Sequence, residues 1–231
     1  MSKALCRGLK DSLSIAVGYV PVAISFGLAA VAADVPAWAA IMFSVLVYAG
    51  ASQFVLVSLI SQQAWFLTVV AVVWLMNLRH LFYGPALLNA AQPCQPKRPT
   101  LFWGAGLTDE VFATAVGRLA KQPDSDKEDW YLGLQLGAYL SWVGGTAIGA
   151  LFGADWLGRW EVLDKSLGFV LPALFFTLLL EIAEAVPRPV LLAAALGAGL
   201  SLLVVPVYVA IIVGMFTGCL AVLVGAKHEH N

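Results

Sequence analysis

The chain has 231 residues, of which 61% are hydrophobic and 12% are charged, with a mean hydropathy of +0.86 and a formal net charge of −1. A soluble domain carries roughly 25% charged residues because it needs a polar exterior, so the composition excludes one. The net charge says nothing about partners, and no basic patch in the sequence suggests that the chain binds nucleic acid.

Long apolar runs predict an all-α polytopic membrane protein. Several are about 20 residues long, enough to cross a hydrocarbon core of roughly 30 Å. Clusters of proline mark their ends, because proline lacks a backbone donor and disfavours helix in the residue before it. We expect one domain over residues 1–231 with about seven to eight transmembrane helices, some of them broken, over 12–33, 37–60, 64–91, 100–119, 130–152, 167–186, 189–204 and 206–225. Only Pro206 divides the last two.

The first run resembles a signal peptide, because basic residues precede it and Ala30-Val31-Ala32 resembles a cleavage site. However, 12–33 exceeds the usual apolar region of about 7–15 residues and contains Pro21. We therefore expect it to remain as the first helix.

The basic residues of the loops predict a cytoplasmic N-terminus. With 64–91 as one crossing, residues 1–11 form an inside loop. The inside then holds Lys3, Arg7, Lys10, Lys121, Lys127, Arg188 and Lys227, against Lys97, Arg98, Arg159 and Lys165 outside. If 64–91 is a re-entrant pair, every later segment inverts, so the side of the C-terminus stays open.

A faint internal repeat is a further hypothesis. Pro21 and Pro36 are separated by the same interval as Pro172 and Pro187, and both second prolines follow valine. Inverted repeats of this kind underlie many secondary transporters, although chance matches compete with this interpretation in a chain rich in proline.

Polar residues inside the apolar runs are the candidate functional site, since a charge at a helix centre costs about 2.5–3.5 kcal/mol on insertion scales. This cost requires partners or water. We expect a substrate or proton pathway formed by Gly50, Ser52 and Gln53, by Asn77, Arg79, His80 and Gly84, and by Thr108, Asp109 and Glu110. Glu181 and Glu184 are better interpreted as interfacial.

Arg79 offsets a carboxylate of the run 100–119 in this interpretation. Asp109 and Glu110 are about 100° apart around a helix, so one pairs with Arg79 while the other faces the pathway. His80 shares a helix face with Asn77 and Gly84.

Two helix breaks are expected beside these residues. Pro85 after Gly84 can break the third run, and Gly50 with its small neighbours offers room for a ligand in the second. Helix N-termini at such breaks carry partial positive charge and bind anionic groups in transporters.

Simpler interpretations remain open for each group. Arg79 and His80 can snorkel from a short helix over 64–78. Asp109 and Glu110 can lie in a loop if 100–119 is not one helix. Gly50 to Gln53 can serve close helix packing, with Gln53 bonding between helices.

Four stretches also carry a family resemblance. The chain resembles the AzlC-like permeases, the large subunits of branched-chain amino acid exporters, in GYVPVAISFG (18–27), GASQF (50–54), NLRHLFY (77–83) and LTDEVF (107–112). The resemblance implies a two-component exporter in the bacterial cytoplasmic membrane. Its partner would be a small hydrophobic AzlD-like subunit, and its substrates valine, leucine, isoleucine and in some members methionine. No cofactor is implied.

These observations suggest proton-driven efflux of a zwitterionic amino acid. Arg79, or a helix N-terminus near Gly50 or Gly84, would hold the carboxylate. Asp109 or Glu110 would take the ammonium group or the proton, and histidine is an alternative proton carrier, here His80. The expected apolar walls are Phe54, Phe82, Tyr83 and Phe112.

Other function classes have less support. A passive channel would use the same polar groups as a pore lining. An intramembrane enzyme would need a nucleophile or metal set, and a single inward histidine without an H-E-x-x-H motif argues against one. The lack of a nucleotide-binding P-loop argues against ATP-driven transport by this chain alone. Its three cysteines are far apart and suit neither a disulfide framework nor a metal site. An assembly partner would tolerate neutralisation of both Arg79 and Asp109.

Overall fold

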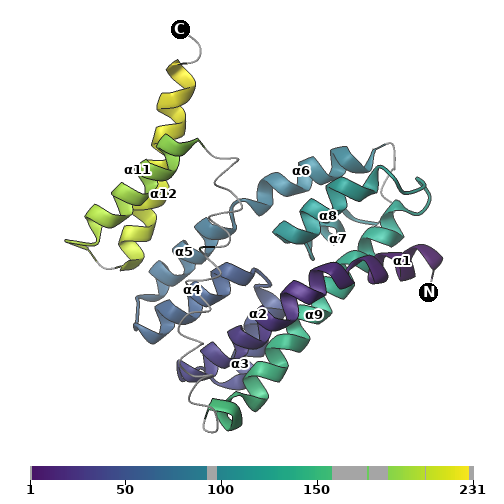
Figure 1. The fold of residues 1–231 in the computed structure, drawn as a ribbon, viewed down its shortest axis with the longest axis horizontal. Coiled ribbons are helices and arrows are strands. Elements are labelled where there is room, and N and C mark those ends of the chain that lie inside the picture. Colours follow the sequence, from purple (N-terminus) through teal and green to yellow (C-terminus); the bar gives the residue numbers. More distant parts are fainter. Residues whose placement is uncertain (1, 93–97, 158–175, 177–186, 206, 229–231) are drawn as a thin grey trace. The chain divides into compact units, whose positions relative to one another are not determined.

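The computed structural model describes residues 2–92, 98–157, 176, 187–205 and 207–228 (Figure 1). All regular structure in these ranges is helical, which confirms the expected fold class. The run 167–186, with Glu181, Glu184 and Pro172 of the supposed repeat, lies outside them except for residue 176. The described helices fall into two compact units, one holding most of the chain up to residue 170 and one formed by 64–72 with the C-terminal part.

The first unit begins with two successive helices. The N-terminal segment, expected as a loop, forms α1 (Lys3–Asp11), whose first turn is capped by the Ser2 hydroxyl accepting from the Leu5 amide at 3.2 Å. The expected first transmembrane helix is confirmed as α2 (Leu13–Ala32), and Pro21 lies inside it. α2 is long and apolar enough to cross a membrane.

The second apolar run forms two half-length helices, α3 (Ala37–Leu46) and α4 (Gly50–Ser61). At 1.5 Å per residue each spans roughly half of a 30 Å hydrocarbon core. The connection places Tyr48 at φ 42°, a left-handed backbone conformation that is uncommon outside glycine. The expected break beside Gly50 is therefore confirmed.

The third run is interrupted at Leu78–Arg79, between α5 (Phe66–Asn77) and α6 (His80–Ala91). The break expected at Gly84-Pro85 was placed wrongly. Pro85 lies in the second turn of α6, where it removes one helical hydrogen bond without ending the helix. Residues 66–91 together form an apolar stretch of 26 residues, long enough for one crossing.

The fourth run was expected to be one helix over 100–119, and this was wrong. It forms the short α7 (Thr100–Gly104) and, after a four-residue connection, α8 (Asp109–Leu119). Thr108 starts α8, because its hydroxyl accepts from the Val111 amide at 3.3 Å. Asp109 and Glu110 occupy the first turn, where the helix dipole favours negative charge.

The long helix α9 (Lys127–Leu157) confirms the expected run 130–152 and is the central support of this unit. It packs beside α1, α2 and α3, and Figure 1 shows α9 and α2 side by side. A side chain at Gly149 would meet the backbone carbonyl of Ile24 on α2, so glycine is what permits this close approach.

In the other unit, α11 (Arg188–Ser201) and α12 (Val207–His228) pack against each other. The expected division of the last apolar run near Pro206 is confirmed. Small residues make the contact, since Gly197 faces Thr217 and Gly214 faces Ala194 and Ala198.

Candidate functional site

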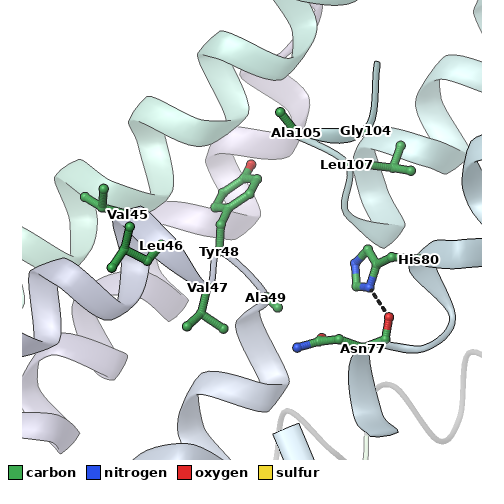
Figure 2. Close-up of a pocket in the computed structure, with 10 residues that line it drawn as sticks. All are labelled: Val45, Leu46, Val47, Tyr48, Ala49, Asn77, His80, Gly104, Ala105 and Leu107. Carbon is green, nitrogen blue, oxygen red and sulfur yellow. Dashed lines mark hydrogen bonds between the residues drawn. The ribbon is translucent and has the colours of Figure 1, made fainter. Parts of the chain in front are cut away.

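Three helices of the first unit begin directly after a break: α4 at Gly50, α6 at His80 and α8 at Asp109. A pocket of about 230 Å³ lies among the connections between these half-helices (Figure 2). It is lined by Val45, Leu46, Val47, Tyr48, Ala49, Asn77, His80, Gly104, Ala105 and Leu107.

The pocket is small, and its lining combines aliphatic side chains with polar groups. Its volume is below the roughly 300–1,000 Å³ of sites for drug-sized ligands, so it suits a smaller solute. Side chains of valine and leucine from the end of α3 and from the α7–α8 connection supply the apolar surface. The polar lining comes from Tyr48, Asn77 and His80. Such a lining can hold a small molecule with one apolar and one polar end.

Tyr48 is a pocket residue that the sequence analysis did not identify. Its side chain is 6% exposed, yet its hydroxyl has no partner among the described residues. The ring packs edge-on against Tyr139 at 5.0 Å, and Figure 2 shows the hydroxyl directed toward Ala105. A buried hydroxyl without a partner, on a strained backbone, is typical of a functional position. Its only sequence signal is its place just before Ala49-Gly50.

Asn77 presents an acceptor at the pocket. The Ser52 hydroxyl donates to the Ala49 carbonyl at 2.8 Å, so it must accept from the Asn77 amide nitrogen at 3.1 Å. This fixes the orientation of the amide and leaves its Oδ1 without a partner in the described ranges.

His80 lies beside Asn77 and is bonded to it. Its Nδ1 is 3.0 Å from the Asn77 carbonyl, the bond drawn in Figure 2. A backbone carbonyl only accepts, so Nδ1 carries the proton and Nε2 is left for another partner. The structure thus brings Asn77, His80 and Ser52 together. The helix face expected to hold Asn77, His80 and Gly84 is interrupted, because α5 ends at Asn77 and α6 begins at His80.

Arg79 pairs with Asp109 beside the pocket, with 3.0 Å between Nη1 and Oδ2. Tyr83 donates to the other Asp109 oxygen at 2.7 Å and stacks on Phe112 at 4.4 Å. The expected pairing of Arg79 with one carboxylate is therefore present, and that carboxylate is Asp109. The Arg79 Nε is buried and has no described partner, so the guanidinium keeps hydrogen-bonding capacity.

Glu110 points elsewhere, as two successive helical residues must. Its Oε2 is 2.5 Å from the hydroxyl of Tyr19 on α2, and that hydroxyl is 2.6 Å from the Thr108 Oγ1. Tyr19 is 8% exposed and was not identified from the sequence as a site residue, although it lies within the GYVPVAISFG stretch.

Gln53 is fully buried and holds the α3–α4 break in place. Its Oε1 accepts from the Ala49 amide at 3.2 Å and from the Trp142 indole at 2.9 Å, and its Nε2 donates to Ser44 at 2.9 Å. Its side chain is therefore fully engaged behind the pocket, which matches its simpler interpretation as a bond between helices.

Gly50 and Gly84 do not line the pocket. Gly50 starts α4 against the Trp142 ring, 3.5 Å from where a Cβ would lie. Gly84 lies inside α6, and no described atom comes within 4 Å of its Cβ position.

The four residues expected as apolar walls lie outside this pocket. Phe54 packs against Phe26 at 5.3 Å, Phe82 is 75% exposed, and Tyr83 and Phe112 stack on each other. None of the four lines the pocket, whose apolar surface is aliphatic.

Comparison with known proteins decides the family. Residues 14–155 match the family model described as AzlC protein, and this range includes every residue that lines the pocket. The chain belongs to the AzlC family. As a member of this family with long apolar helices, it is an integral membrane protein.

Several relatives of this AzlC protein are membrane proteins by name. It is 37% identical to "Inner membrane protein YgaZ" of Escherichia coli, over 97% of this chain and 92% of that one. It is 38% identical to an uncharacterized membrane protein of Archaeoglobus fulgidus, over 75% of this chain and 74% of that one. It is 29% identical to "Branched-chain amino acid transport protein AzlC" of Bacillus subtilis, over 74% of this chain and 64% of that one. No solved structure matches the chain.

Proposed function

We propose that this AzlC protein is a secondary active transporter that exports branched-chain amino acids across the cytoplasmic membrane. Valine, leucine and isoleucine are the main substrates, and methionine is a further one. The observation that carries the proposal is the small pocket with aliphatic side chains and unpartnered polar atoms at the helix breaks. The name of the Bacillus subtilis relative supports the substrate class.

The pocket residues fit the two ends of such a substrate. The Asn77 Oδ1 is an acceptor and would bind the ammonium group, and the Tyr48 hydroxyl would complete the polar contacts. The carboxylate would lie toward the N-termini of α4 and α6, whose partial positive charge favours anions, with Arg79 alongside. The aliphatic side chain would pack on Val45, Leu46 and Leu107.

The family resemblance supports the direction of transport and the partner, and the acidic residues and histidine in the apolar runs support proton coupling. Export is driven by the proton gradient, and a small hydrophobic AzlD-like subunit completes the transporter. The N-terminus lies in the cytoplasm, since basic residues are in excess on that side.

Efflux of labelled valine tests this function. Cells lacking their own exporters would be preloaded and would express the chain with the small subunit, either intact or as Arg79→Ala. Loss of the Asp109 partner leaves an unpaired carboxylate beside the pocket, so we expect efflux to fall at least tenfold in the variant. Equal membrane levels of the two forms are the control.

Two results would contradict the proposal. Wild-type efflux from Arg79→Ala would show that Arg79 is not needed for transport and only extends its charge toward water at the membrane surface. Valine movement that never proceeds against a gradient, even with the intact pair, would indicate a passive channel instead.

A further inference from the structure

Three oxygen atoms form a short hydrogen-bonded chain beside the pocket. The Tyr19 Oη is 2.5 Å from the Glu110 Oε2 and 2.6 Å from the Thr108 Oγ1, both at the short end for hydrogen bonds between oxygens. Tyr19 is buried on α2, whereas Glu110 is otherwise exposed in the isolated chain. One side of the carboxylate is thus fixed by a tyrosine and the other is accessible.

The hydrogen-bonded set formed by Tyr19, Glu110 and Thr108 holds a limited number of protons. A tyrosine hydroxyl has one proton, so Tyr19 donates to one neighbour and accepts from the other. With Glu110 ionised, Thr108 donates to Tyr19 and Tyr19 donates to Glu110. With Glu110 protonated, Glu110 donates to Tyr19 and Tyr19 donates to Thr108.

In both arrangements the Tyr19 hydroxyl donates to one neighbour and accepts from the other; with Glu110 protonated, the Thr108 hydroxyl proton has no acceptor among the described residues. The Thr108 Oγ1 accepts from the Val111 amide at 3.3 Å and keeps this bond in either case. The two states differ in one added proton and in the rotation of two hydroxyl groups, and no heavy atom has to move. Glu110 can therefore gain and lose a proton without breaking the contact between α2 and α8.

Asp109 has no such freedom. It holds the Arg79 guanidinium at 3.0 Å and the Tyr83 hydroxyl at 2.7 Å, and protonation would weaken the ion pair. The neighbours of Glu110 are different in kind. The titratable and charged groups around it are Tyr19 from α2, Tyr48 from the α3–α4 connection, Arg79 and Tyr83 from the start of α6, and Asp109 from α8 itself.

From this geometry we infer that Glu110 carries the coupling proton, with Tyr19 and Thr108 as the hydroxyl pair that stabilises both of its states. This inference rests on the proposed transport function and decides between the two carboxylates. In each cycle the Glu110 carboxylate forms an O–H bond with a proton from the outer side and releases that proton to the cytoplasm.

Tyr19 also provides a contact toward the substrate pocket. Its ring packs edge-on against Trp142 at 5.2 Å, and the Trp142 indole donates to Gln53, which holds the Ala49 amide at the pocket wall. Glu110 is therefore connected, through Tyr19 and Trp142, to Gln53 behind the pocket.

Proteoliposomes containing the chain and its small subunit would test the inference through two readouts. Net transport of labelled valine against its gradient requires proton movement, whereas exchange of labelled for unlabelled valine does not. We expect Glu110→Gln to keep exchange and to lose net transport and its pH dependence at least tenfold. Retained exchange also shows that the variant is folded.

Two further variants sharpen the test. Tyr19→Phe should move the midpoint of the pH profile of net transport toward higher pH, because the ionised carboxylate loses a charge-assisted hydrogen bond. Asp109→Asn should lower exchange and net transport together, with the wild-type pH profile retained in the residual activity.

The outcomes are distinguishable. Net transport by Glu110→Gln with the wild-type pH profile would overturn the inference, as would loss of pH dependence in Asp109→Asn alone. An unchanged pH profile in Tyr19→Phe would show that the Tyr19 and Thr108 hydroxyls do not stabilise the proton states of Glu110. Absence of valine exchange in the wild-type pair would overturn the proposed function itself, and with it the inference.

Discussion

At the scale of single residues, three features stabilise the Asp109 carboxylate: its ion pair with Arg79, a hydrogen bond from Tyr83 and its position in the first turn of a helix. The ion pair joins the start of α6 to the first turn of α8, and Tyr83 fixes the second oxygen of the carboxylate. The position of Asp109 in the first turn of α8 further reduces the free-energy cost of a charge in an apolar run, since negative charge is favoured there. Charges inside apolar runs are accommodated here by pairing and by helix ends.

Gln53 gives the residue-scale prediction. Its replacement in Gln53→Leu leaves the Ala49 amide and the Trp142 indole without their buried acceptor, at a cost of about 1–3 kcal/mol each. Thermal unfolding of the purified protein in detergent should show a clear loss of stability. Gln62→Leu, on the exposed end of the same helix, should change stability by less than about 0.5 kcal/mol. Equal stability of the two variants would contradict this role.

The polar residues near the pocket could be found from the sequence, whereas Tyr48 and Tyr19 could not. An arginine in an apolar run has a high free energy of membrane insertion, which identifies it as a candidate site residue. A tyrosine has no such signal, because its ring is compatible with an apolar run and only the fold shows whether its hydroxyl has a partner. The backbone strain at Tyr48 likewise has no signature in composition.

At the scale of helices, the site depends on interruptions. Hydropathy predicted the extents of the runs but not their breaks, because the connections at 47–49 and 105–108 are nearly as apolar as the helices. Two breaks did have a local signal. Gly50 with its small neighbours indicated the break that was expected in the second run. A threonine followed by two acidic residues, as at Thr108, is typical of a helix start, and it was outweighed by the apolar run around it.

The packing of α2 on α9 gives the element-scale prediction. Gly149→Ala places a methyl group against the Ile24 carbonyl and should destabilise the protein by about 1–3 kcal/mol. Gly144→Ala, on the same helix, has no described atom within 4 Å of the new group and should be neutral or stabilising by up to about 1 kcal/mol. Thermal unfolding in detergent measures both. Loss of stability in Gly144→Ala but not in Gly149→Ala would contradict the packing.

At the scale of the whole molecule, the pocket lies within the region that matches the family model. Residues 14–155 contain α2 through most of α9, and with them the three broken runs whose connections line the pocket. The helices α11 and α12 lie beyond this region in the sequence. The helical class and the division of the chain were predictable from the apolar runs, because length and hydropathy determine which segments enter a membrane. The pocket was not predictable, since it depends on how three breaks come together.

The measurement that tests the central claim most directly is valine efflux from cells in which the pocket has been filled. Ala105 lines the pocket, so Ala105→Trp should abolish efflux while the protein still reaches the membrane. Ala113→Trp makes the same change on an exposed part of α8 away from the pocket, and it should transport at the wild-type rate. Wild-type efflux from Ala105→Trp would show that the substrate binds elsewhere.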